Sequence, residues 1–139
     1  MRIGIVGHEA AKFTTDGERQ AREIIRTLLA PEDAVLVSGH CHLGGIDIWA
    51  EEEADAFGRA KLIFPPKSFD WANGYKPRNL LIAQNSDVVH CIVVRELPAS
   101  YKGMRFKLCY HCKTDAHVKS GGCWTALRCP TREWHVIEQ

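Results

Sequence analysis

The chain has 139 residues, of which 45% are hydrophobic and 25% are charged. This length corresponds to one domain, and the composition is that of an ordinary globular protein. Its 18 basic and 17 acidic side chains leave a formal net charge of +1. The chain as a whole therefore has no strong electrostatic attraction for nucleic acid or for an anionic membrane.

The N-terminal stretch and the cysteines indicate the cellular compartment. The N-terminal stretch MRIGIVGHE turns polar after Val6, so it lacks the apolar region of a signal peptide. No apolar run approaches the roughly 20 residues of a membrane span. We therefore expect a cytoplasmic protein, in which the 6 cysteines are thiols or metal ligands rather than disulfides.

Strand and helix patterns alternate along the chain. Strands are expected at 2–6, 34–37, 61–64, 87–94 and 134–137, and helices at 15–30, 46–57, 77–85 and, briefly, from about 122. Thr14, Thr15 or Asp16 would cap the first long helix, and Gly58 suits the end of the second. This alternation predicts an α/β, three-layer Rossmann-like fold with a mainly parallel sheet in a single domain, residues 1–139.

The unusual loops all follow the predicted strands. Because ligands of such sheets bind at the carboxyl ends of the strands, we expect these loops to converge on one crevice. Glycines there let the backbone approach a ligand, and helix starts favour anions. The candidate ligand-binding residues are Gly7, His8, Ser38, Gly39, His40, Gly44, Gly45, Asp47, Arg78, Asn79, Gly121, Gly122 and Thr125.

Several of these side chains have two interpretations. Arg78 could grip a phosphate in bidentate fashion or form an ion pair with a carboxylate. Asp47 could accept from a ribose hydroxyl, but capping of its helix is the interpretation that the sequence favours. A group of loop aromatics could stack on a base or simply cover the sheet; its members are Phe69, Trp71, Tyr75 and Trp124.

Four stretches carry a resemblance to a known family: MRIGIVGHE, VSGHCHLGGIDIWAEEEA, KPRN followed by SDVVHCIVV, and GGCWTA. They resemble the SLOG superfamily, which includes the LOG or lysine decarboxylase-like phosphoribohydrolases and the DprA/Smf DNA-processing proteins. The match covers residues 1–95 and, loosely, 117–139; its most specific parts are SG-x5-GID-x2-A and the RN before an apolar strand. The resemblance implies a Rossmann-like sheet that binds a nucleotide or a nucleotide-derived ligand, and it makes a homodimer a reasonable expectation.

The chain departs from the hydrolases of that family at their PGGxGTxxE loop. Ser120 stands at the proline, Trp124 at the later glycine and Leu127 at the glutamate that helps to cleave the N-glycosidic bond. Binding is therefore favoured over catalysis. An N-glycosidase acting on a nucleotide remains the alternative, with Glu51 and Glu52 as its candidate catalytic carboxylates. The third hypothesis is a module that zinc holds together and that binds nucleic acid or another protein. The nearly neutral net charge of the chain gives little support to nucleic-acid binding.

A cysteine and histidine pattern, C-x2-C-x4-H-x5-C, occupies the irregular insertion at 97–123. It resembles a zinc knuckle with one additional residue before the last cysteine, and thiolate with imidazole favours zinc. We therefore predict a structural zinc held by four ligands, which are Cys109, Cys112, His117 and Cys123. Two substitutes stay open: Cys129 could replace His117 or Cys123, and His111 lies close by.

The remaining cysteines differ in their expected roles. Cys91 lies inside an apolar strand and is expected in the core. Cys41 lies between two histidines, where a catalytic thiol is conceivable and a plain loop thiol is more common. Cys123 belongs both to the zinc pattern and to the Gly-rich loop, so a metal there would fix the loop that closes the crevice.

Overall fold

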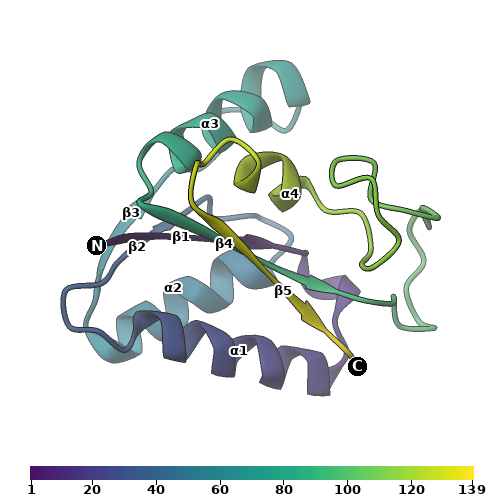
Figure 1. Ribbon diagram of the computed structural model, residues 1–139, viewed down its shortest axis with the longest axis horizontal. Coiled ribbons are helices and arrows are strands. Elements are labelled where there is room, and N and C mark those ends of the chain that lie inside the picture. Colours follow the sequence, from purple (N-terminus) through teal and green to yellow (C-terminus); the bar gives the residue numbers. More distant parts are fainter.

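The computed structural model describes residues 1–139 and consists of a five-stranded sheet between two layers of helices (Figure 1). All neighbouring strands pair in parallel, in the order β3-β2-β1-β4-β5. The strands are β1 (Arg2–Gly7), β2 (Val35–Ser38), β3 (Ala60–Ile63), β4 (Val88–Val94) and β5 (Arg132–Ile137). The predicted three-layer α/β fold is thus confirmed, and its sheet is entirely parallel.

Two hydrophobic cores lie on opposite faces of the sheet. Helices α1 (Thr15–Leu29) and α2 (Ile46–Phe57) cover one face, on which Ile5, Ile25 and Trp49 belong to the same core cluster. Helices α3 (Lys76–Gln84) and α4 (Gly121–Ala126) cover the other face, where the core includes Val93 and Cys91. Because side chains alternate along a strand, β4 contributes to both cores, as its nearly continuous apolar sequence requires.

The ends of the long helices follow local chemistry. Thr14 caps α1, since its Oγ1 accepts a hydrogen bond from the backbone N–H of Gly17 at 3.0 Å. Helix α2 has the predicted bounds, and it lies between two glycines with left-handed backbone, Gly45 (φ 83°) and Gly58 (φ 69°). A Cβ at Gly45 would collide with the carbonyl oxygen of His8, so glycine is needed where the chain enters α2.

The structure differs from the predicted elements mainly before α3. Residues Trp71–Tyr75 form one π-helical turn, η2, in a segment predicted as a loop. Asp70 begins this turn, because its Oδ2 accepts from the N–H of Asn73 at 2.9 Å. Helix α3 then starts at Lys76 rather than Pro77. A short 3-10 turn, η1 (Ala10–Lys12), also follows β1, and strand boundaries shift by one or two residues.

The segment between β4 and α4 has little regular structure, as expected for the insertion. Its one bridge pairs Cys109 with Thr114, and it runs beside α4 at one end of the sheet (Figure 1). No helix of the protein has both the length and the apolar character that crossing a bilayer requires.

Gly7 provides a test of the contact between β1 and β4. A Cβ there would collide with the carbonyl oxygen of Ile92, whereas one at Gly121 would meet nothing within 4 Å. We expect Gly7→Ala to lower the free energy of unfolding by about 2 to 3 kcal/mol, because the central ladder must open. Gly121→Ala is the matched control and should change it by less than about 1 kcal/mol. Urea unfolding measures both, and equal effects would contradict the packing described.

Candidate functional site

One cavity of about 680 Å³ lies at the carboxyl end of β1, where the order of the strands reverses. It is bounded by the segment after β1, the loop before α2, the η2–α3 segment and the start of α4. Eight of the predicted ligand residues line it: Gly7, His8, Asp47, Arg78, Asn79, Gly121, Gly122 and Thr125. The other five do not: Ser38, Gly39, His40, Gly44 and Gly45.

Residues of the loop after β2 support the cavity from behind. Gly39 leaves space for the side chain of Arg78, whose guanidinium would clash with a Cβ at that position. The hydroxyl of Ser38 is fully buried and has no hydrogen-bond partner. His40 is exposed, and its Nδ1 lies 2.7 Å from Oε2 of Glu51. The glycines of this loop therefore shape the wall without forming its surface.

The proposed catalytic carboxylates lie outside the cavity. Glu51 pairs with His40, and Oε2 of Glu52 lies 2.8 Å from Nη2 of Arg22 on α1. Glu52 thus faces α1 and Glu51 faces the loop after β2, and neither carboxylate lines the crevice. The carboxylates that do line it are Glu9 and Asp47.

Asp47 is a buried carboxylate that holds the preceding loop. Its Oδ2 accepts from the N–H of Cys41 at 3.0 Å, and no side chain caps α2. The expected capping role of Asp47 was therefore wrong, because Gly45 takes the N-cap position. Burial raises the pKa of Asp47 above its usual value, and the positive charge of Arg78 opposes that shift.

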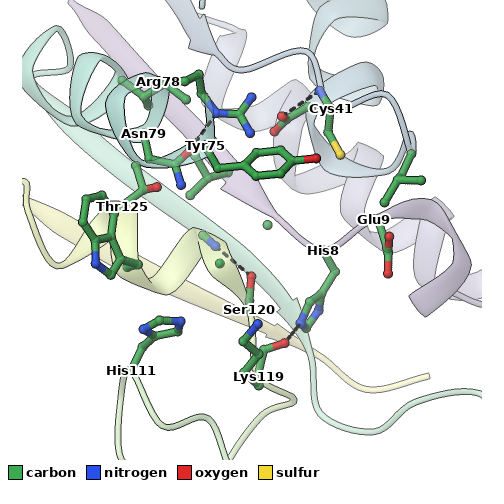
Figure 2. A pocket seen from close by; sticks show the side chains of 18 of the residues that line it. His8, Glu9, Cys41, Tyr75, Arg78, Asn79, His111, Lys119, Ser120 and Thr125 are labelled. Atoms are coloured by element: carbon green, nitrogen blue, oxygen red, sulfur yellow. Dashed lines mark hydrogen bonds between the residues drawn. The ribbon is translucent and has the colours of Figure 1, made fainter. Parts of the chain in front are cut away.

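The guanidinium of Arg78 lines the cavity and makes hydrogen bonds to the protein through only some of its N–H groups (Figure 2). Its Nη1 donates to the carbonyl of Gly39, and its Nε donates to Oδ1 of Asn79 at 2.7 Å. Its charged carbon lies 5.5 Å from the centre of the Tyr75 ring. These contacts hold the group in place and leave Nη2 without a hydrogen-bond partner in the protein.

The facing wall is organised by His8, which lies opposite Arg78 in Figure 2. The N–H of Val94 donates to its Nδ1 at 3.1 Å, so Nε2 carries the proton and donates to the carbonyl of Lys119 at 3.0 Å. Burial and the charge of Lys12 lower the pKa of His8 to about 3, and the ring is neutral. His8 thus positions the segment that leads to α4, whose N-cap Ser120 accepts from the N–H of Gly122 at 3.1 Å.

The polar lining residues that were not among the candidate ligand-binding residues include Glu9, Lys12, Tyr110 and Lys119. Glu9 and Lys12 pair at 3.6 Å just after β1, where proximity to a strand end could have indicated them. Burial lowers the pKa of Lys12 below its usual value. Tyr110 and Lys119 lie among the predicted metal ligands, and nothing in their spacing indicates that they face a cavity.

Three of the four loop aromatics line the crevice. The rings of Trp71 and Trp124 meet edge to face, with centroids 4.9 Å apart, and Tyr75 lies beside Arg78. Phe69 is outside the cavity and stacks on His42 at 4.1 Å. The rings therefore form a wall of the cavity rather than only a cover for the sheet.

Cys41 lines the cavity, but nothing activates it as a nucleophile. Burial raises the pKa of its thiol above the usual value, which disfavours the thiolate. Its neighbour His40 is turned toward Glu51 instead. The structure favours a plain loop thiol.

Beside the cavity, the chain brings together Cys109, Cys112, His117 and Cys123 into a cluster that could hold a metal ion. Their ligand atoms all lie within 4.8 Å of one another. Nδ1 of His117 donates to the carbonyl of Val118 at 2.8 Å, which leaves the Nε2 lone pair directed at the cluster, 3.9 Å from Sγ of Cys123. An outer hydrogen bond of this kind fixes the tautomer that a metal requires.

Hydrogen-bond donors surround two of the sulfur atoms, those of Cys109 and Cys123. Burial would raise the pKa of Cys109, but N–H groups of the backbone, at Cys112, Ser120 and His111, lower it below its usual value. The indole N–H of Trp134 donates to Sγ of Cys123 at 3.3 Å. Burial raises the pKa of Cys112, so the crowded thiols do not all ionise without a cation.

Cys129 and His111, the two possible substitute ligands, lie outside the Cys/His cluster. Cys129 is buried in the core, and its thiol lies 3.8 Å from the carbonyl oxygen of Ser86. His111 lines the crevice instead of joining the cluster. Cys91 is fully buried, as predicted, with its Sγ 4.0 Å from that of Cys123.

No protein-family model matches the chain, and no curated protein matches it. Among solved structures, the Moco carrier protein of Chlamydomonas rheinhardtii is 16% identical over 65% of this chain and 59% of that one, with a TM-score of 0.48. DNA processing protein A (DprA) of Streptococcus pneumoniae is 17% identical over 98% of this chain and 58% of that one, with a TM-score of 0.49.

The chain thus spans about three fifths of the length of either protein. Likeness at this level identifies neither a family nor an activity. The resemblance to the SLOG superfamily accordingly stays a prediction.

His8 makes the stability of the protein depend on pH. Below pH 6.5 the unfolded chain binds a proton at His8 that the folded protein does not bind until about pH 3. The stability due to the neutral ring is complete above pH 6.5 and falls by up to about 1.4 kcal/mol for each pH unit below it. In urea unfolding at a series of pH values, the advantage of wild type over His8→Gln should shrink with falling pH. A constant difference would show that the ring titrates normally.

Proposed function

We propose that the protein binds a nucleotide or a nucleotide-derived small molecule in the crevice, beside a structural zinc. The observation that supports this most directly is the meeting of three features in one cavity. These features are the fixed guanidinium of Arg78, the glycine start of α4 and a wall of aromatic rings. The cavity of about 680 Å³ is within the size range of small-molecule sites.

Arg78 would bind the anionic part of such a ligand. Its Nη2 is free to donate a hydrogen bond. The side chain of Arg78 is already held by Gly39, Asn79 and Tyr75, so little side-chain entropy is lost when a ligand binds. Gly121 on the opposite side leaves the wall open, because even a Cβ there would meet no atom within 4 Å. A phosphate between these two walls would meet a cation on one side and closely approaching backbone on the other.

The aromatic rings would bind the planar part. Trp71 and Trp124 present ring edges and faces to the cavity, and stacking of a base on such rings contributes roughly 1 to 3 kcal/mol. Arg128 stacks 3.8 Å from the centre of the Trp124 ring and fixes its orientation. This combination of a fixed cation with aromatic rings favours a nucleotide over a simple anion.

Zinc fits the donor set of the Cys/His cluster. Three thiols and one imidazole with a free Nε2 match the ligands that a structural site uses, and bound zinc would supply the positive charge that the thiolates lack. Four protein ligands complete a tetrahedron, so the role would be structural. The cluster would hold residues 118–122, and with them the wall of the crevice that contains Lys119 and Gly121.

Binding is favoured over catalysis by the position of the acidic run. Glu51 and Glu52 do not face the crevice, so the N-glycosidase hypothesis loses the carboxylates offered for it. The cavity also gives little support to a nucleic-acid interaction module. Its cations, which include Arg78, are partly balanced by the carboxylates of Glu9 and Asp47, so the cavity is not a strongly basic surface.

Metal content tests the zinc. We expect one zinc per chain to survive dialysis into metal-free buffer, and Cys109→Ser to lose it because three ligands hold the ion far less tightly. Cys129→Ser is the matched control, since that buried thiol lies outside the cluster. Elemental analysis of the three proteins provides the measurement. Zinc retained by Cys109→Ser, or absent from wild type, would refute the assignment.

A thermal-shift and calorimetric screen of nucleoside mono-, di- and triphosphates tests the ligand. At least one should bind wild type with a dissociation constant in the micromolar range. Gly121→Val puts side-chain atoms into the cavity at a position where a Cβ meets no atom within 4 Å, and it should weaken binding at least about tenfold, with the melting temperature preserved.

Glu52→Gln is the control for this screen, because its carboxylate pairs with Arg22 away from the crevice. It should bind as wild type does, and wild type should release no free base from the bound nucleotide. If no nucleotide binds, or if Gly121→Val binds as tightly as wild type, the proposal fails. Release of base would instead support the hydrolase.

A further inference from the structure

A second group of metal-ligand side chains lies on the strands β4 and β5, on the face of the sheet that α1 covers. His90 and Glu133 are register partners across the two strands, and His135 follows Glu133 on the same face. The neighbours of His90 and His135 along this face, Ile92 and Ile137, belong to the core under α1. Figure 1 shows β5 as the edge strand beside α1.

The three donor atoms converge on one point. Nδ1 of His90 lies 2.9 Å from Nε2 of His135 and 3.8 Å from Oε2 of Glu133. All three atoms lie within 4.8 Å of one another. Around a tetrahedral ion with bonds of about 2.0 to 2.1 Å, two donor nitrogens lie about 3.3 Å apart, so the imidazoles need only a small separation.

These three side chains make few polar contacts within the protein. The two imidazoles share a single proton in their contact, and the carboxylate of Glu133 has His90 as its only salt-bridge partner. Burial lowers the pKa of both histidines, so both rings are neutral at pH 7, which is the form that binds metals. His90 is the one polar side chain of β4, whose other residues are valine, isoleucine and cysteine.

The site is open to incoming ions. His90 is only 7% exposed, but Glu133 is an exposed side chain, and His135 borders a hollow of about 440 Å³ against α1. The only charged side chain of that hollow is Glu23, so no cation lines it. Three protein ligands would leave a coordination position for water, unlike the closed Cys/His cluster.

We propose that His90, Glu133 and His135 form a second metal site, which takes a borderline divalent transition metal such as Ni²⁺, Zn²⁺ or Cu²⁺. Imidazole nitrogen with carboxylate oxygen suits these ions, and the absence of thiolate distinguishes the site from the Cys/His cluster. The cross-strand contact would then join the edge strand β5 to β4 through a metal ion. This site is independent of the ligand in the crevice.

Nickel titration of protein dialysed until it holds one zinc per chain tests the proposal, because that zinc fills the thiolates, the second site is left empty, and Ni²⁺ is paramagnetic. Calorimetry should show one Ni²⁺ per chain with micromolar affinity, and NMR should show broadening centred on His90 and His135. His135→Gln should weaken binding about 10- to 100-fold, and Glu133→Gln by a smaller factor. His40→Gln is the matched control, since it removes a histidine that also contacts a carboxylate but lacks a third ligand.

Unchanged Ni²⁺ binding in both His135→Gln and Glu133→Gln would overturn the proposal, as would broadening centred elsewhere or no binding by wild type. The zinc content of each variant shows whether it has folded. Because Glu133 is exposed, Glu133→Gln keeps the test decisive even if His135→Gln does not fold. None of these results depends on whether a nucleotide binds in the crevice.

Discussion

The hydrogen bonds of His8 connect the parts of the protein that form the crevice. Its ring accepts from Val94 at the end of β4 and donates to Lys119 in the insertion. Its backbone carbonyl accepts from the N–H of Ile46, the first residue of α2, at 3.1 Å. One residue therefore sets the positions of the sheet, the insertion and the helix start. These bonds need a neutral imidazole, which burial provides, so the shape of the crevice depends on keeping water and protons away from this ring.

The Cys/His cluster and the crevice share one short segment. Five residues, 118–122, separate His117 from Cys123, and four of them line the cavity: Lys119, Ser120, Gly121 and Gly122. Both ends of this wall are therefore residues of the Cys/His cluster. His8 holds its middle through the carbonyl of Lys119. With a metal ion at the cluster, the segment would be fixed at three points and would lose few conformations when the proposed ligand binds.

Local sequence patterns predicted the elements and the cluster but not the direction of each side chain. The bounds of α2 follow from its periodicity and from Gly45 and Gly58, and the four metal-ligand positions follow from their spacing. By contrast, Gly39 contacts Arg78, which lies 39 positions further along the chain. A local pattern does not contain such a contact, so the sequence could not distinguish Gly39 from a glycine that faces a ligand. The position of Glu52 has the same origin, because only the packing of α2 on α1 shows that its carboxylate pairs with Arg22 away from the crevice.

Strand β4 relates the two metal-ligand clusters to each other. Cys91 on one face lies 4.0 Å from the sulfur of Cys123, while the adjacent His90 points to the opposite face and meets His135. The clusters thus lie back to back across a strand that is paired on both sides, to β1 and β5. Such a strand moves little, since any shift must break two ladders of hydrogen bonds. Ions at the two clusters would therefore act on one rigid element, and each would hold a different part of the chain against it: the insertion on one face and the edge strand on the other.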